Sequence, residues 1–362
     1  MQEPPHTATA TTNAQSSALL LPLSEHHSSD PRSVGYLGAN LAELARMGLP
    51  VAAGFCVTAH AFLYSMERVG QRAALREADS EVSVLRPLAL ASVSRRLQEI
   101  VLEAGMPREL SDAITRECAA LGGGRFWVRA SNVPGPTSAF NSRRGPSYGN
   151  VPATDVWKAV QRCWLSIFTQ RALGERAAHD HQANGEPALA VVVQRMPAYE
   201  KSGVMFTADP MTGDRALVVI DSLGLDEVVP GARVDPNVYA MDKRTRRMLT
   251  RVCYKTSDAW SSDVERHSEL LSHERVARVL DDSDLSLLTT TAQRFDEQWG
   301  EPRKVLWALA AGALHILRSR CLEVPEWVTP ALAIERASSA FGRTDHEFPV
   351  KIATSRFSAG RL

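Results

Sequence analysis

Three strand patterns in close succession, between residues 188 and 221, most constrain what this chain can fold into. They are the segments ALAVVVQRM (188–196), GVMFTAD (203–209) and RALVVID (215–221). Short apolar runs rich in valine and bounded by glycine, proline or aspartate are typical of buried strands. A long segment with helical spacing, beginning at about Thr154, precedes them. Together these patterns predict a mixed α and β fold.

The rest of the chain continues this mixture. Helical spacing is present in 33–50, in two segments of 86–121 separated near Gly105, and in the polar stretch 256–300. Strand patterns occur at 54–58, at 126–131 and on both sides of 242–247. The segment KVLWALAAGALHILRSRC, residues 304–321, predicts a β-hairpin with its reversal at 310–312.

The composition is that of an ordinary globular protein, and 362 residues are enough for two lobes with separate cores. Lysine plus arginine and aspartate plus glutamate both total 41, so no net field attracts nucleic acid or a membrane surface. The longest apolar stretches fall short of the roughly 20 residues that a membrane helix needs. We therefore expect neither nucleic acid nor a membrane as a partner.

The cysteines and the first residues bear on location. Five cysteines are scattered along the chain with no C-x-x-C pair, which favours reduced thiols and a cytoplasmic protein without a zinc site. The brief LLLPL run near the start has no basic segment before it, so residues 1–30 are expected to form a flexible tail rather than a signal peptide.

Several blocks in one order resemble a known family. GANLAELARMGLPVAAGFCVT, VRAS, VWKAVQRCWLSIFTQRA, ALAVVVQRM, GVMFTADPMTGD and VVIDSLGLDEVV follow one another within residues 33–322. This order is similar to the nucleotide-binding region of phosphoenolpyruvate synthases, pyruvate phosphate dikinases and rifampicin phosphotransferases. The resemblance implies an α+β, two-lobed ATP-grasp-like fold that binds an adenine nucleotide between its lobes.

The resemblance also implies a domain organisation. We expect a tail at 1–30, an N-terminal lobe at 31–185, a C-terminal lobe at 186–325 and an extension at 326–362. The phosphohistidine domain and the pyruvate-binding barrel of phosphoenolpyruvate synthases have no counterpart in these blocks. The complete phosphoenolpyruvate synthase reaction is therefore not expected of this chain.

The retained blocks imply candidate binding residues. In VRAS, Arg129 matches a phosphate-contacting arginine of the family and Ser131 follows it; in VVVQRM, Gln194 matches a glutamine near the nucleotide base. From the residues alone, Gln194 reads equally well as a polar residue at a strand edge. Further candidates lie in the loop before Ser147 and at the end of the hairpin. The full set of expected nucleotide- or anion-binding residues is Arg129, Ser131, Arg143, Arg144, Ser147, Gln194, Arg318 and Arg320. Arg143 and Arg144 could equally decorate an exposed loop.

Other family positions have changed. The lysine of a G-G-K-G-A-N-L block is Leu37 here, and in the hairpin a glutamate is replaced by Leu306 and a glutamine by Arg318, whereas Arg320 is retained. Magnesium prefers oxygen ligands in octahedral array, and neither leucine nor arginine supplies an oxygen. No metal is therefore predicted, and ordinary magnesium-dependent kinase activity is disfavoured.

Three functions stay open. The first is a metal-independent, nucleotide-dependent group transferase of bacterial small-molecule metabolism, or a subunit of one, with sulfuryl transfer from a sulfonucleotide as one form. The second is a noncatalytic pseudoenzyme that serves as scaffold for a partner enzyme. The third is an ATP-dependent phosphotransferase resembling rifampicin phosphotransferases, which would need a compensating metal ligand such as Asp221 or Glu227. A small-molecule substrate and a partner protein subunit are the expected partners.

Overall fold

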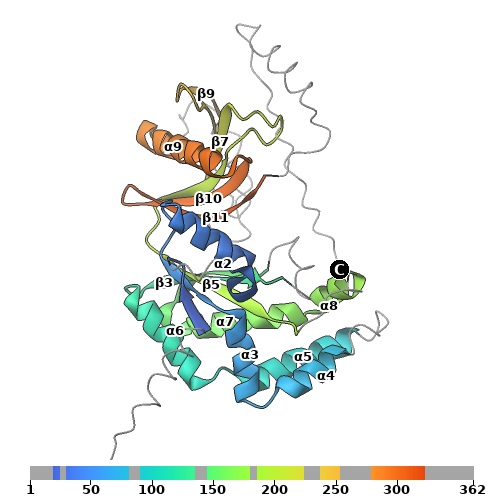
Figure 1. Cartoon of the computed structure of the whole chain (residues 1–362). Helices are drawn as coiled ribbons and strands as arrows, with labels where there is room; N and C mark the ends of the chain where they lie inside the picture. Colours follow the sequence, from blue (N-terminus) through green and yellow to red (C-terminus); the bar gives the residue numbers. More distant parts are fainter. Residues whose placement is uncertain are drawn as a thin grey trace, which may run out of the picture. The chain divides into compact units, whose positions relative to one another are not determined.

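The computed structural model describes residues 19–24, 30–80, 90–134, 145–179, 186–223, 237–252 and 279–322. These residues form two compact units (Figure 1). The first unit comprises the described residues up to Glu200 together with Ala308–Arg318. The second unit comprises Lys201–Trp307 and the described residues from Ser319 onward.

A five-stranded antiparallel sheet forms the centre of the first unit. Its spatial order is β1 (Leu20–Pro22), β2 (Gly54–Val57), β5 (Leu189–Met196), β3 (Arg125–Asn132) and β4 (Ser147–Pro152). Strand β5 is central because it pairs with both β2 and β3, and its residues 189–194 are all buried. This burial explains why the sequence of β5 is almost continuously apolar rather than alternating.

Helices complete the core of the first unit. Helix α2 (Pro31–Arg46) packs on β3 and β5, α3 (Ala59–Arg68) packs on β5, and α7 (Val156–Leu165) packs on β3, β4 and β5. The remaining helices of this unit are α4 (Arg72–Ser80), α5 (Leu90–Ala104), α6 (Arg108–Ala120) and α8 (Gln170–His179). The long helix expected from Thr154 is interrupted, since a 3₁₀ turn at Ser166–Phe168 separates α7 from α8.

The second sheet has six strands in the order β11, β10, β6, β7, β8, β9. Their bounds are β6 Lys201–Phe206, β7 Leu217–Leu223, β8 Asn237–Asp242, β9 Met248–Val252, β10 Arg303–Ala310 and β11 Ala313–Cys321. Helix α9 (Asp282–Trp299) packs on β6 and β7. The expected hairpin is confirmed as β10–β11, with positive φ angles of 50° and 73° at Ala311 and Gly312 in its turn.

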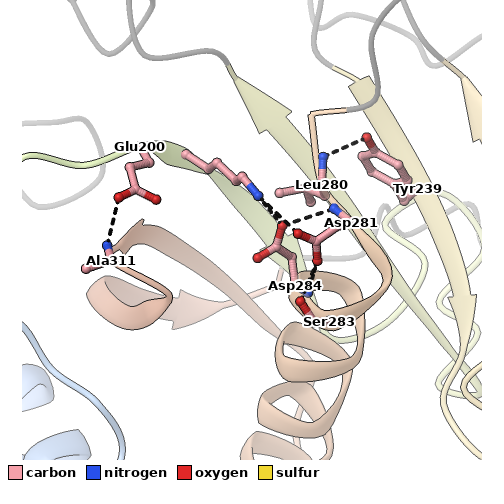
Figure 2. A network of polar contacts seen from close by, with 8 residues as sticks. Glu200, Tyr239, Leu280, Asp281, Ser283, Asp284 and Ala311 are labelled. Atoms are coloured by element: carbon pink, nitrogen blue, oxygen red, sulfur yellow. Dashed lines mark hydrogen bonds and ion pairs between the residues drawn. The ribbon is translucent and has the colours of Figure 1, made fainter.

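Polar contacts fix the start of α9, as Figure 2 shows. The carboxylate of Asp281 accepts a hydrogen bond from the Asp284 backbone N–H at 2.9 Å, and the Asp284 carboxylate accepts one from the Asp281 N–H at 3.0 Å. This reciprocal capping box satisfies two backbone donors that the helix cannot. The Lys201 ammonium makes an ion pair with Asp284, which ties the start of β6 to the helix.

Two expectations about the chain's organisation need correction. Residues 20–22 of the expected tail form strand β1, because Leu19, Leu20 and Leu23 are buried and their burial offsets the entropy of ordering the segment. The expected boundary at 185/186 would place β5 in the C-terminal lobe, whereas β5 pairs with β2 and β3 in the first unit. The expected extension at 326–362 lies outside the described residues.

Candidate functional site

Arg129 is a buried cation in the central strands of the first unit. Its side chain lies on β3, is 5% exposed and donates through Nη2 to the Oε1 atom of Gln194 on β5. Gln194 is completely buried, and its Nε2 donates to the carbonyl of Ala52 at 3.0 Å. The guanidinium carbon of Arg129 also lies 5.2 Å from the centre of the Trp127 ring. Arg129 is thus held in one orientation by an amide and an indole.

The electrostatic environment of Arg129 is unfavourable for its charge. Burial lowers the pKa of Arg129 to about 9, and the positive charge of Arg318 acts in the same direction. Within the part of the chain that the structure describes, Nε of Arg129 has no hydrogen-bond partner. A buried donor without an acceptor is costly, so this atom is a candidate for binding a ligand oxygen.

Ser131 joins the glycine-rich start of α2 to β3. Its hydroxyl donates to the carbonyl of Val34 at 2.7 Å and accepts from the N–H of Gly38 at 3.0 Å. Gly35 lies between them with φ 71° and ψ 171°, and a Cβ atom there would be 2.3 Å from the Ser131 carbonyl oxygen. Ser131 therefore positions backbone, and the glycine is required both by its dihedral angles and by the close approach.

Ser147 pairs with Arg129 across β3 and β4. Its hydroxyl accepts a hydrogen bond from the Trp127 indole N–H at 2.7 Å. The contact orients the ring that lies beside the Arg129 guanidinium. Arg143 and Arg144, expected on the preceding loop, lie outside the described residues.

Arg318 and Arg320 differ in their surroundings although both lie on β11. Arg318 is partly exposed and belongs to the first unit, where it influences Arg129. Arg320 is exposed and belongs to the second unit. The structure therefore brings Arg129 and Gln194 into direct contact, and the charge of Arg318, in the same unit, acts on Arg129.

Two aromatic side chains that interact with Arg129, those of Trp127 and Tyr199, were not predicted from the sequence. Trp127 precedes Arg129 by two residues on the same strand. Tyr199 is 6% exposed, interacts electrostatically with Arg129, and its ring centre lies 6.0 Å from that of His315. Strand alternation could have placed Trp127 on the face of Arg129. Nothing in the local sequence relates Tyr199 to Arg129.

The second unit contains a partly buried carboxyl group at Asp221 on β7, with its Oδ1 atom shielded from solvent. Desolvation raises its pKa to about 6, although the charge of Lys304 opposes the shift. Among the described residues its Oδ1 atom has no hydrogen-bond partner. Leu306, on the same face of β10 as Lys304, is partly exposed.

The residues at the expected metal positions do not fit magnesium. Neither the isobutyl group of Leu306 nor the guanidinium of Arg318 carries an oxygen, which is the donor that magnesium requires. Within the described ranges no group of three or more His, Cys, Asp or Glu side chains could hold a metal ion. In the same residues no helix is long and apolar enough to cross a membrane.

Comparisons with known proteins identify relatives of this chain. A rifampicin phosphotransferase from Streptomyces sp is 31% identical over 315 residues, which cover 84% of this chain and 36% of that protein. A probable phosphoenolpyruvate synthase from Methanothermobacter thermautotrophicus is 30% identical over 300 residues, which cover 79% of this chain and 43% of that protein. The matched region of this chain thus spans less than half the length of these relatives.

A solved structure of D-alanyl-alanine synthetase A from Vibrio cholerae matches with a TM-score of 0.28 and 12% identity, over 66% of this chain and 53% of that one. The family model of the pyruvate phosphate dikinase AMP/ATP-binding domain matches residues 32–336. The match covers most of both units, and the expected α+β, ATP-grasp-like nucleotide-binding region is confirmed. The chain therefore belongs to the pyruvate phosphate dikinase AMP/ATP-binding domain family.

Proposed function

We propose that this chain binds an adenine nucleotide through Arg129 and takes part in the transfer of one of the nucleotide's phosphoryl groups. The observation that carries the proposal is the buried guanidinium of Arg129, oriented by Gln194 and left with Nε unpartnered among the described residues. The forked N–H groups of arginine match the oxygens of a phosphate group, and a low dielectric strengthens this attraction.

Phosphoryl transfer is the reaction class that such a site supports. It depends on positioning the phosphates and on neutralising the charge that develops on their oxygens, rather than on covalent chemistry by the protein. Relatives in the family are named as rifampicin phosphotransferase and phosphoenolpyruvate synthase. The role of this chain's own residues is to hold the phosphates: Arg129 supplies charge, and Gln194 and Trp127 hold its orientation.

Sulfuryl transfer from a sulfonucleotide stays a prediction from the sequence. Neither of the two relatives described above carries that activity in its name. The noncatalytic scaffold differs from the proposed function in one measurable respect, since a scaffold binds nucleotide or partner without consuming the nucleotide.

The test compares ATP binding, by isothermal titration calorimetry, for the parent chain, Arg129→Gln and Arg125→Gln. Arg125 lies on the same strand but is exposed and hydrogen-bonded to the Asn150 carbonyl, so it is a matched control for net charge. We expect Arg129→Gln to weaken binding by roughly 10- to 100-fold, the range for a charged hydrogen bond. Arg125→Gln should change it less than threefold.

Chromatography of the nucleotides after incubation provides the second readout. With water as the phosphoryl acceptor, we expect ATP to give ADP and inorganic phosphate with the parent chain, and both products to be strongly reduced with Arg129→Gln. Binding without any conversion would contradict phosphoryl transfer and favour the scaffold. Absence of binding to the parent chain would overturn the proposal itself.

A further inference from the structure

We propose that Ser147 is a positioning residue for Arg129: its hydroxyl holds the Trp127 indole, and the indole holds the guanidinium that binds phosphate. The inference rests on the proposed function and specifies how strand β4 sets the phosphate affinity of Arg129. It differs from the direct contact with the nucleotide that the family resemblance implies for Ser147. Two contacts carry it, the hydrogen bond from Trp127 Nε1 to Ser147 Oγ at 2.7 Å and the 5.2 Å between the Arg129 guanidinium carbon and the Trp127 ring centre.

The three side chains lie on one face of the first sheet. Ser147 on β4 is paired directly with Arg129 on β3, and Trp127 lies two residues before Arg129 on the same strand. Side chains two residues apart along a strand point to the same face. Ser147 and Trp127 are therefore diagonal neighbours across the two strands, a spacing that a long aromatic side chain can bridge.

An irregularity in the strand pairing lies at the tryptophan. The register of β3 and β4 shifts between Phe126 and Val128, on either side of Trp127. A bulge bends a strand and changes the direction of a side chain. The indole N–H can only donate a hydrogen bond, and here it donates to the Ser147 hydroxyl oxygen. The position of the ring thus depends on a hydroxyl group of the neighbouring strand.

Two groups from different strands orient the Arg129 guanidinium. The Gln194 amide oxygen on β5 accepts from Nη2, and the Trp127 ring lies beside the guanidinium carbon. One hydrogen bond holds one nitrogen of this planar group, whereas contact with a ring also restricts the tilt of the plane. Nε has no hydrogen-bond partner among the described residues, so the direction of its N–H toward a ligand oxygen depends on both contacts. Loss of the hydrogen bond that anchors the ring should therefore weaken phosphate binding.

The serine end of this arrangement can be altered without opening the core. Gln194 is completely buried and donates to the Ala52 carbonyl, so its replacement disturbs the centre of the sheet. Ser147 is exposed and Trp127 is partly exposed. Substitutions at these two positions can therefore change the orientation of Arg129 while the protein stays folded.

The experiment is a double-mutant cycle on ATP binding, measured by isothermal titration calorimetry for the parent chain, Ser147→Ala, Trp127→Phe and the double variant. Trp127→Phe keeps an aromatic ring and loses the N–H that Ser147 accepts. We expect Ser147→Ala to weaken binding roughly three- to tenfold, the range for one neutral hydrogen bond, and Trp127→Phe to weaken it at least as much. Because both substitutions remove the same bond, the double variant should bind within twofold of Trp127→Phe.

Matched variants and a spectroscopic signal complete the test. Ser147→Thr keeps the hydroxyl and should bind ATP within twofold of the parent chain, as should Ser111→Ala, which removes an exposed hydroxyl on α6. In spectra of protein labelled with ¹⁵N-tryptophan, the Trp127 indole signal is identified by its loss in Trp127→Phe. This signal should move in Ser147→Ala and stay in place in Ser111→Ala. Thermal unfolding establishes that each variant is folded.

The outcomes separate this inference from the proposed function. A Ser147→Ala variant that binds ATP as the parent chain does would overturn the positioning role. So would a double variant weakened by the product of the two single effects, because Ser147 would then contact the ligand independently of Trp127. Both results leave the proposed function intact if Arg129→Gln weakens binding. An ATP affinity that Arg129→Gln leaves unchanged would overturn the proposed function and the positioning role together.

Discussion

The hydroxyl of Ser131 on β3 donates a hydrogen bond of 2.7 Å to the carbonyl of Val34 at the start of α2. The same oxygen accepts from the Gly38 N–H at 3.0 Å. Through these two bonds, the strand that carries Arg129 also fixes the glycine-containing first turns of α2. The candidate site and the start of this helix are therefore one structural element.

Replacement of Ser131 should loosen that connection. In Ser131→Ala, the buried Gly38 N–H loses its side-chain acceptor, which costs about 1–3 kcal/mol of unfolding free energy. Urea unfolding measures the loss, with Ser111→Ala as control because the Ser111 hydroxyl is exposed and bonds only within α6, to Arg108. Equal stability of Ser131→Ala and Ser111→Ala would show that the connection contributes nothing.

Gly35 and Gly70 offer a matched test of close packing. Both have φ of 71°, but a Cβ at Gly35 would overlap the Ser131 carbonyl, whereas a Cβ at Gly70 would meet no atom within 4 Å. We expect Gly70→Ala to cost about 1 kcal/mol, from the backbone conformation alone. Gly35→Ala should cost several kcal/mol more or prevent folding. Similar midpoints of thermal unfolding for the two variants would contradict the close approach.

Two substitutions of Gln194 test separately how the charge of Arg129 and the hydrogen bond that orients it contribute to binding and stability. Gln194→Glu keeps the shape and adds a carboxylate beside Arg129, so it should neutralise the anion site and weaken ATP binding by roughly tenfold or more. Gln194→Leu removes the acceptor and should lower the unfolding free energy by about 1–3 kcal/mol. Calorimetric titration and urea unfolding measure the two effects. An unchanged ATP affinity in Gln194→Glu would show that Arg129 does not bind the phosphates of ATP.

Asp221 should make stability depend on pH. Its pKa is raised to about 6 in the folded protein from 3.8, so the folded state holds this proton more tightly than the unfolded state. The contribution of Asp221 to the free energy of unfolding therefore falls by about 3 kcal/mol as pH rises from about 4 to 6. Above pH 6 it stays at this lower value. Asp221→Asn lacks the ionisation and should lack this decrease.

Urea unfolding of the parent chain and of Asp221→Asn at pH 4 and pH 7 measures the difference directly. All other titrating groups are common to the two proteins, so subtraction isolates Asp221. A difference in unfolding free energy that is the same at both pH values would show that Asp221 is not desolvated.

Most elements were predictable because their signals are local. The break near Gly105, the apolar run of β5 and the turn of the β10–β11 hairpin all lie where the sequence places them. Tertiary contacts overrode local appearance in two places. Strand β1 lies in a segment whose sequence predicts a flexible tail. Strand β5 pairs within the first sheet, although along the chain it is followed directly by the strands of the second sheet.

The candidate site was predictable only in part. Family resemblance singled out Arg129, Ser131, Ser147, Gln194 and Arg318 as expected binding residues. The hydrogen bonds of the Ser131 and Ser147 hydroxyls to the start of α2 and to Trp127 were not predicted. A short motif does not show which residues, distant along the chain, become the hydrogen-bond partners of its side chains.

The sequence by itself determined the family and the mixed α and β class, because both depend on residue identity and order. Only the tertiary structure decided that Arg129 is buried and that Gln194 holds it. The physical reason is that desolvation and charge interactions depend on distances between strands brought together by folding, and those distances are not encoded in any local pattern.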